Sequence, residues 1–224
     1  MGDAVPAFRL DHDKIAALNA RIADDLYVQG WSVCTDYVPE DLRAALLADL
    51  AAQEEAGRLT LAAVGRDTTQ TVETTIRNDR TLWLAGRDAA PAAYLDLMGR
   101  LRLDLNRRLI LGLFEYEAHY ARYDAGGFYR KHVDALHGER NRVVSTVTYL
   151  TPDWAESDGG HLVLYDAVDQ DRAIARVLPA AGTLAVFLSE EIPHEVLPPA
   201  RPRNSIAGWF RCNPSGEDRV DPLR

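Results

Sequence analysis

Apolar residues recur every three to four positions through the first half of the chain, a spacing typical of amphipathic helices packed on a core. The pattern predicts three helices and one short strand: a helix over 15–26 capped by Asp13, a strand over 31–34, a helix that begins at Pro39, and a helix over about 91–110. We expect the apolar faces of these helices to form ordinary core.

Beyond residue 113 the period changes to two, because apolar and polar side chains alternate as they do along a half-buried strand. Strands are predicted in five segments that Gly, Pro and Asp separate: 114–123, 142–151, 161–165, 175–189 and 204–212. Helices followed by many short strands favour an α+β fold, with the strands in a sandwich or jelly roll and the helices packed on one sheet.

Two segments fit neither pattern. The polar, threonine-rich stretch over 64–83 is expected to form a long hairpin or a mobile flap. The segment over 213–224 is expected to be a loosely ordered C-terminal tail.

Composition narrows the class of protein. The chain has 224 residues, 47% of them hydrophobic, and a net charge of −9 without a large basic cluster, so nucleic acid and anionic membranes are not expected partners. No apolar run is long enough for a membrane span, and the N-terminus shows no secretory signal pattern. The two widely separated cysteines, Cys34 and Cys212, favour a reducing, cytoplasmic location.

The candidate chemistry begins in FYRKHVDAL, residues 128–136, where His132 and Asp134 are two positions apart. Residues at this spacing point to the same side of a strand, so both can face one metal ion. His194, just past an apolar strand, is the best third ligand, and two histidines with one carboxylate are the ligand set of non-haem Fe(II) oxygenases. Alone, a strand end in solvent or a structural histidine would explain these residues as well.

Arg203 lies nine positions beyond His194, after a turn-rich connection, and is expected to begin the next strand. A guanidinium group holds a carboxylate through two parallel hydrogen bonds and keeps its charge, so it suits the distal carboxylate of 2-oxoglutarate. The alternative interpretation is a surface arginine in a basic turn.

Five segments together carry a resemblance to a known family: IRNDRTLWL (76–84), YDAGGFYRKHVD (123–134), TYLTPDW (148–154), DGGHLVLY (158–165) and PHEVLPPARPRNSIAGWF (193–210). In order and spacing they resemble the 2-oxoglutarate/Fe(II) dioxygenases of the prolyl 4-hydroxylase superfamily, and most closely the hypoxia-inducible-factor prolyl hydroxylases and their bacterial relatives. The resemblance implies a double-stranded β-helix within a single dioxygenase domain over 1–212, with helical support over 11–110 and a jelly-roll core over about 113–212.

The resemblance also implies residue roles. His132, Asp134 and His194 look like the Fe(II) ligands, Arg203 like the catalytic-site partner of 2-oxoglutarate, and Tyr149 like a hydrogen-bond donor to the same carboxylate. Further cosubstrate-pocket residues are expected at Tyr123, Leu162 and Trp209, and substrate contacts at Arg77, Asp79 and Tyr129. By physics alone, the Arg77–Asp79 pair would be an exposed ion pair of little value. The remaining histidines, among them His12, His119, His137 and His161, are expected to be surface or core residues.

The activity implied is hydroxylation of a prolyl residue in a protein, with elongation factor Tu as the leading candidate client. The cofactors implied are Fe(II), 2-oxoglutarate as cosubstrate and O2, with ascorbate as a candidate accessory reductant. Three alternatives stay open: a hydroxylase of free amino acids or other small molecules, a zinc hydrolase using the same ligands, and a non-catalytic metal-binding interaction module.

Overall fold

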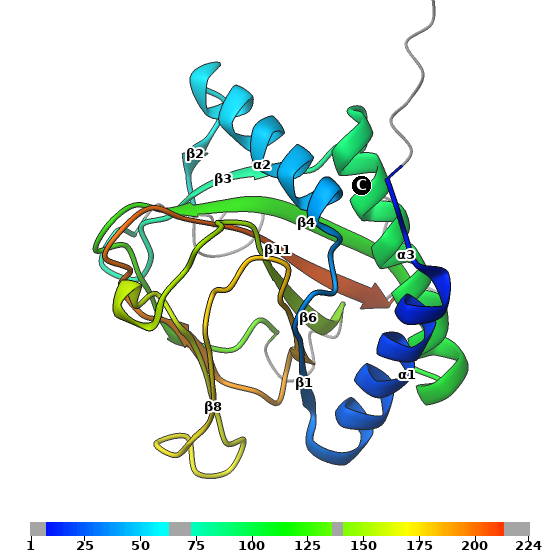
Figure 1. Ribbon diagram of the computed structural model, residues 1–224. Helices are drawn as coiled ribbons and strands as arrows, with labels where there is room; N and C mark the ends of the chain where they lie inside the picture. The colour runs from blue at the N-terminus through cyan, green and yellow to red at the C-terminus, as the bar shows by residue number, and fades with distance from the viewer. Residues whose placement is uncertain (1–7, 63–72, 136–140, 213–224) are drawn as a thin grey trace, which may run out of the picture.

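The computed structural model has three helices on one face of a large sheet and a smaller sheet on the opposite side (Figure 1). It describes residues 8–62, 73–135 and 141–212. The expected tail over 213–224, His137 and much of the expected flap therefore lie outside the described residues. None of the described helices has the length and apolar character needed to cross a membrane.

The helices are α1 (His12–Gln29), α2 (Glu40–Glu55) and α3 (Ala89–Leu109), and a short 3-10 helix spans Glu156–Asp158. The large sheet has the order β1 (Trp31–Cys34), β9 (Leu184–Leu188), β6 (Arg142–Tyr149), β11 (Arg203–Cys212), β4 (Leu113–Tyr123), β3 (Arg80–Trp83) and β2 (Thr60–Leu61). The smaller sheet has the order β5 (Tyr129–His132), β10 (His194–Val196), β7 (Leu162–Tyr165) and β8 (Ala173–Val177). Neighbouring strands are antiparallel in both sheets.

Helix α1 shows how local chemistry sets the boundaries. Asp11, rather than the expected Asp13, is the N-cap, and its side chain accepts a hydrogen bond of 3.0 Å from the Lys14 N–H. Asp13 lies in the first turn, where a negative charge still stabilises the helix dipole. The helix ends at Gly30, whose φ of +80° is the left-handed conformation that glycine adopts without strain.

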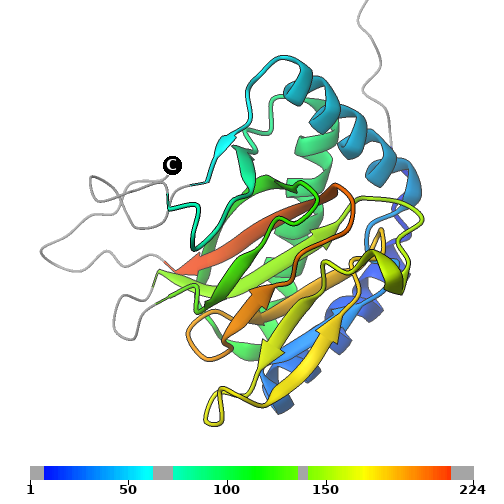
Figure 2. The ribbon, with the colours of Figure 1, turned by 90° about the vertical axis from the view of Figure 1, so that its left-hand side faces the viewer.

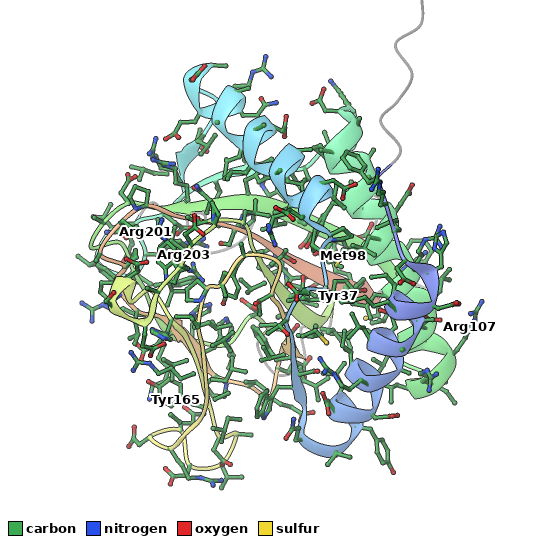
Figure 3. All side chains as sticks on the ribbon, viewed as in Figure 1. Tyr37, Met98, Arg107, Tyr165, Arg201 and Arg203 are labelled. Atoms are coloured by element: carbon green, nitrogen blue, oxygen red, sulfur yellow. The ribbon has the colours of Figure 1, made fainter. Side chains whose placement is uncertain are left out.

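The apolar stripes of the three helices pack on the large sheet, as their spacing predicted. Tyr37 and Met98 lie fully buried in this layer, whereas Arg107 on the outer side of α3 points away from it (Figure 3). Polar groups in the layer are paired: the Tyr37 hydroxyl donates to the Asn19 side chain at 2.7 Å. This layer is the main core of the molecule.

A second apolar cluster fills the space between the two sheets, which lie side by side in Figure 2. Tyr123, Tyr149 and Phe187 come from the large sheet, and Leu162 and Leu164 from the smaller one. The arrangement is a double-stranded β-helix with helices on one sheet, so the predicted α+β fold is confirmed.

Two strand predictions needed correction. The segment over 175–189 divides between β8 and β9, which belong to different sheets. The connection after His194, expected to be irregular, contains the short strand β10, which pairs with both β5 and β7. Its three residues are too few for a visible pattern, so pairing with neighbours rather than local sequence makes it a strand.

Candidate active site

The three candidate metal ligands meet at the edge of the smaller sheet. His132 ends β5, Asp134 follows two residues later, and His194 begins the adjacent strand β10, directly opposite His132. The Nε2 atoms of His132 and His194 lie 3.5 Å and 3.6 Å from the two carboxylate oxygens of Asp134. One ligand atom from each residue lies within 4.8 Å of the others, close enough to hold a single ion.

Backbone carbonyls orient both imidazole rings. The Nδ1 atoms of His132 and His194 lie 2.7 Å and 3.1 Å from the carbonyl oxygens of Arg130 and Ile192. Because a carbonyl only accepts, each Nδ1 carries the proton, and each Nε2 presents its lone pair to the site. Burial lowers the pKa of His194 to about 4, which keeps the ring neutral as a metal ligand must be.

Asp134 is held as a carboxylate by its surroundings. Burial raises the pKa of Asp134, but in acid, where the His194 ring is protonated, the charges of His194 and His132 outweigh this effect and hold the pKa of Asp134 well below its usual value. The Ser145 hydroxyl donates a hydrogen bond of 2.6 Å to Oδ2 of Asp134, and Ser189 lies 2.9 Å from Ser145. Sequence reasoning missed both serines. The available signal was alternation, since Ser145 shares a face of β6 with Tyr149, four residues later.

Aromatic rings pack against the imidazoles. Tyr129 stacks on His132 with ring centroids 3.6 Å apart, and Phe187 contacts His194 at 4.6 Å. The Arg77 guanidinium lies 4.4 Å from the centroid of the same Tyr129 ring. The expected substrate residue Tyr129 therefore contacts both a cation and a candidate metal ligand.

The Arg77–Asp79 pair corrects an expectation. Two hydrogen bonds of 2.7 Å and 2.6 Å join the side chains, and Asp79 is 0% exposed, so the pair is not a solvent-exposed ion pair. The pair is buried because the loop that contains Arg77 packs against β5, where the backbone of Arg77 forms a bridge with Tyr129. The pair therefore lies beside Tyr129, which stacks on His132.

Arg203 is the first residue of β11, as predicted, and is only 1% exposed, so the surface-arginine interpretation is wrong. Its guanidinium lies 5.0 Å and 4.9 Å from the ring centroids of Tyr123 and Tyr149. Within the described residues, Nε and Nη2 of Arg203 and the Tyr149 hydroxyl have no hydrogen-bond partner. A buried cation beside an unsatisfied donor is costly unless an anion completes the site.

Close approach of the backbone encloses this end of the site. Gly160 has a φ of +67°, and a methyl group there would lie 2.9 Å from Pro199 Cβ and 3.2 Å from Arg203 Cδ. Leu162, two residues later, is buried in the same cluster as Tyr149. Glycine is thus needed at 160 because of the positive φ and the close approach of Pro199, with Arg203 packed next to it.

Trp209 lies on β11 directly opposite Ser145 on β6, so it shares the surface that faces the metal ligands. The Arg142 guanidinium stacks 3.7 Å from its ring centroid, and the ring of His119 lies 5.4 Å away. His119 and His161 are buried, whereas His12 is exposed, in agreement with their expected surface or core positions.

The donor set fits the groups that the sequence predicted. Two neutral imidazoles and one carboxylate suit a divalent transition metal and leave further coordination positions open. The unpaired Arg203 and Tyr149 groups suit the distal carboxylate of a dicarboxylic cosubstrate.

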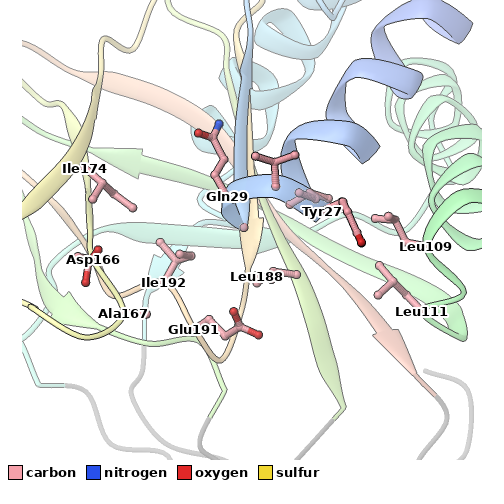
Figure 4. Close-up of a pocket in the computed structure, with 13 residues that line it drawn as sticks. Tyr27, Gln29, Leu109, Leu111, Asp166, Ala167, Ile174, Leu188, Glu191 and Ile192 are labelled. Carbon is pink, nitrogen blue, oxygen red and sulfur yellow. The ribbon is translucent and has the colours of Figure 1, made fainter.

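A separate hollow of about 500 Å³ lies on the surface between the end of α1 and the segment that leads to His194 (Figure 4). Leu188, Glu191 and Ile192 form one wall of it. No predicted site residue lines this hollow, so it is distinct from the candidate active site.

Comparisons with known proteins agree with this geometry. The family model of the 2OG-Fe(II) oxygenase superfamily matches residues 118–211. A prolyl-4-hydroxylase from Pseudomonas putida, known from its crystal structure, has 42% sequence identity to this chain. The two structures superpose with a TM-score of 0.79, and the match covers 87% of this chain and 99% of that chain. A prolyl hydroxylase from Trichoplax adhaerens, solved with a hypoxia inducible factor peptide fragment, shares the fold at 23% identity, with a TM-score of 0.80 over 92% and 94% of the two chains.

A curated relative, the prolyl 3-hydroxylase OGFOD1 of Xenopus laevis, is 34% identical over 86 residues, or 35% of this chain. The match spans only 16% of that relative's length.

Proposed function

Because this chain belongs to the 2-oxoglutarate/Fe(II)-dependent dioxygenases of the prolyl 4-hydroxylase superfamily, we propose that it hydroxylates a prolyl residue within a protein. Members of this family use Fe(II), 2-oxoglutarate and O2. The residue roles and the client are parts of the proposal.

The observation that carries the proposal is the burial of Arg203 without a carboxylate partner among the described residues, in the same barrel as the His132–Asp134–His194 cluster. A zinc hydrolase would need the three metal ligands but has no use for a buried cation placed to receive a second carboxylate. A non-catalytic metal-binding module would likewise need the three ligands but not the buried cation. Both together favour a metal site that works with a dicarboxylate.

In the proposed site His132, Asp134 and His194 hold Fe(II), and their number leaves positions open for cosubstrate and oxygen. Bound Fe(II), with 2-oxoglutarate as co-reductant, supplies the O2 chemistry that places one oxygen atom on a C–H bond and yields succinate and CO2. The carboxyl group of Asp134 favours hydroxylation, since relatives that halogenate lack this ligand.

The pocket for the distal carboxylate of 2-oxoglutarate is formed by side chains of the large sheet. Arg203 and the Tyr149 hydroxyl bind the distal carboxylate and so orient the molecule, while Tyr123 closes the pocket beside them. Burial raises the pKa of Tyr149, so its hydroxyl stays protonated and donates. The apolar cluster that contains Leu162 excludes water from this end.

For the client, we propose a prolyl residue in a translation factor, with elongation factor Tu as the first candidate. The Pseudomonas putida relative is a prolyl-4-hydroxylase, and the Trichoplax relative was solved with a peptide, which supports a polypeptide client. Tyr129 stacks on His132 and Arg77 lies against Tyr129, so both would contact the client, whereas the buried Asp79 would hold Arg77 in place. Trp209 would line the same approach.

The enzymatic proposal is tested by succinate release from 2-oxoglutarate with purified protein, Fe(II) and O2. Wild-type protein is expected to release succinate only when Fe(II) is present, and His194→Ala is expected to release none, because one imidazole ligand is lost. Circular dichroism checks that the variant is folded. Succinate release by folded His194→Ala at the wild-type rate would refute the ligand assignment.

The client proposal is tested separately by mass spectrometry of proteins from cells with and without the enzyme. One added oxygen atom on a prolyl residue of elongation factor Tu is expected only when the enzyme is present. The same modification on another protein would replace the client. Hydroxylation of free proline alone would favour the small-molecule alternative.

A further inference from the structure

The candidate metal ligand Asp134 is held by two buried serines, Ser145 in the opposite sheet and Ser189, which directly follows β9. We infer that Ser145 is a positioning residue, whose hydroxyl presets the Asp134 carboxylate for metal binding and so sets the affinity of the centre for a divalent cation. The inference rests on the proposed metal centre.

The geometry of this contact is specific. Ser145 lies on β6 of the large sheet, whereas His132 and His194 belong to the smaller sheet. Its hydroxyl reaches across and donates to Oδ2 of Asp134 at 2.6 Å, within the range of a charge-assisted hydrogen bond. Both serines, Ser145 and Ser189, are fully buried, so water does not compete for these bonds.

Ser189 completes the arrangement. A hydroxyl has one proton, and because Ser145 gives its proton to Asp134, the 2.9 Å contact must be a hydrogen bond from Ser189 to Ser145. The carbonyl of Ser189 also accepts the backbone N–H groups of Asp134 and Ala135 at 3.1 Å and 3.3 Å. Backbone and side chain of Asp134 are therefore held by the same pair of serines.

The consequence is a carboxylate with its orientation fixed before any metal arrives. One lone pair of Oδ2 is occupied by Ser145, and rotation of the carboxylate would break that buried bond. Partners that orient metal ligands typically contribute about 10- to 100-fold in metal affinity. Without the hydroxyl, Asp134 must be ordered at the moment of binding.

The test is titration of metal-free protein with Mn(II), followed by the electron paramagnetic resonance of free Mn(II). Ser145→Ala is expected to raise the dissociation constant about 10- to 100-fold, whereas Ser145→Thr, which keeps a hydroxyl, should bind like the wild type. The visible spectrum of bound Co(II) gives a second readout, because it changes when the carboxylate binds differently. A purely structural serine would move neither.

Ser32 offers a matched control. Its buried hydroxyl donates to Oδ2 of Asp25 at the same 2.6 Å, but on β1, outside the site. Ser32→Ala should therefore lose a similar hydrogen bond and bind Mn(II) with the wild-type dissociation constant. An equal weakening in Ser32→Ala and Ser145→Ala would mean that general loosening, not positioning, causes the effect.

Ser189→Ala keeps the inference testable if Ser145→Ala does not fold. It leaves the Ser145 donor in place but removes the hydroxyl that donates to it, so a smaller, several-fold weakening is expected. Folded Ser145→Ala with the wild-type Mn(II) dissociation constant overturns the inference, as does unchanged affinity in Ser189→Ala when Ser145→Ala is unfolded. Failure of the wild type to bind metal would instead overturn the proposed centre itself.

Discussion

Among single residues, Arg203 and His119 are both buried basic side chains, but only Arg203 keeps its positive charge. Arg203 is a permanent cation whose buried nitrogens lack partners among the described residues, so its burial is stable only if an anion joins it. His119 avoids a buried unpaired charge because its lowered pKa leaves the ring neutral at pH 7. The two residues therefore lead to different predictions, one about cosubstrate and one about pH.

Arg203→Ala should raise the apparent KM for 2-oxoglutarate roughly 30-fold or more, since removing one partner of a buried charged pair costs about 2 kcal/mol or more. Succinate release measured against 2-oxoglutarate concentration checks this. Arg201→Ala is the matched control, because Arg201 is half-buried and already paired with Asp158 at 3.0 Å. An unaltered KM in Arg203→Ala would remove Arg203 from the cosubstrate site.

His119 is 5% exposed and packs against both Trp83 and Trp209, with Nδ1 3.0 Å from the Tyr120 carbonyl oxygen. Burial lowers the pKa of His119 to about 4; the charge of Arg77 adds to this effect. Asp79 and the Tyr120 carbonyl oppose the shift, and Arg142 reinforces it.

The resulting pH dependence has a definite sign. The unfolded chain binds a proton at His119 below about pH 6.5, and the folded chain only near pH 4, so stability should fall as the pH drops through this window. The loss for this residue is on the order of 3 kcal/mol. Urea unfolding at pH 7 and pH 5 should show a smaller difference for His119→Gln than for the wild type. An equal difference would contradict the prediction.

At the scale of elements, the hydrophobic periodicity predicted the long helices and strands but not the short strand β10 or the exact start of α1. The helices and the longer strands have several apolar positions at one spacing, so their existence could be read from sequence. Strand β10 has three residues and owes its conformation to its neighbours. The N-cap of α1 is Asp11 rather than Asp13 because the Asp11 side chain accepts a hydrogen bond from the Lys14 N–H, a detail that the periodicity does not encode.

The same distinction applies to the candidate site. The pair at 132 and 134 was predicted from the alternation of side chains along a strand, but β5 ends at His132 and Asp134 lies in the bend that follows, where its N–H donates to the Ser189 carbonyl. Ser145 was not, since a serine in an alternating strand looks like any polar residue, and only the approach of the second sheet gives it a partner. The burial of Asp79 likewise depends on a loop packing onto β5, which no local pattern encodes.

Strand β11, the centre of the large sheet, has no room for a side chain at Gly208. A methyl group there would lie 2.5 Å from Tyr116 Cζ and 2.9 Å from Ala118 Cβ, atoms of the neighbouring strand. Gly208→Ala should lower the free energy of unfolding by about 1–3 kcal/mol. Urea unfolding monitored by circular dichroism measures this.

Gly99 in α3 provides the contrast. Nothing lies within 4 Å of a methyl group at this helical position, so Gly99→Ala should raise the free energy of unfolding by up to about 1 kcal/mol. If Gly208→Ala and Gly99→Ala changed the free energy of unfolding equally, the close contacts around Gly208 would not limit the side chain there, and the prediction would be wrong.

At the scale of the whole molecule, the two sheets divide the proposed chemistry between them. The smaller sheet and the segment after β5 carry His132, Asp134 and His194, whereas Arg203 and Tyr149 belong to the large sheet. Phe187 connects the halves, since it contacts His194 and belongs to the same apolar cluster as Tyr149. A cosubstrate that touches both the metal and Arg203 therefore joins the two sheets.

This division predicts stepwise stabilisation by ligands, measured as thermal unfolding midpoints with Mn(II) in place of Fe(II) to prevent turnover. Mn(II) at 100 times its dissociation constant should stabilise the fold by about 2.7 kcal/mol, or roughly 5–10 °C at this chain length, and 2-oxoglutarate should add a second increment. Arg203→Ala should keep the first increment and lose much of the second, whereas His194→Ala should lose both, because the cosubstrate binds through the metal. A full second increment in Arg203→Ala would mean that 2-oxoglutarate does not bridge the sheets through that residue.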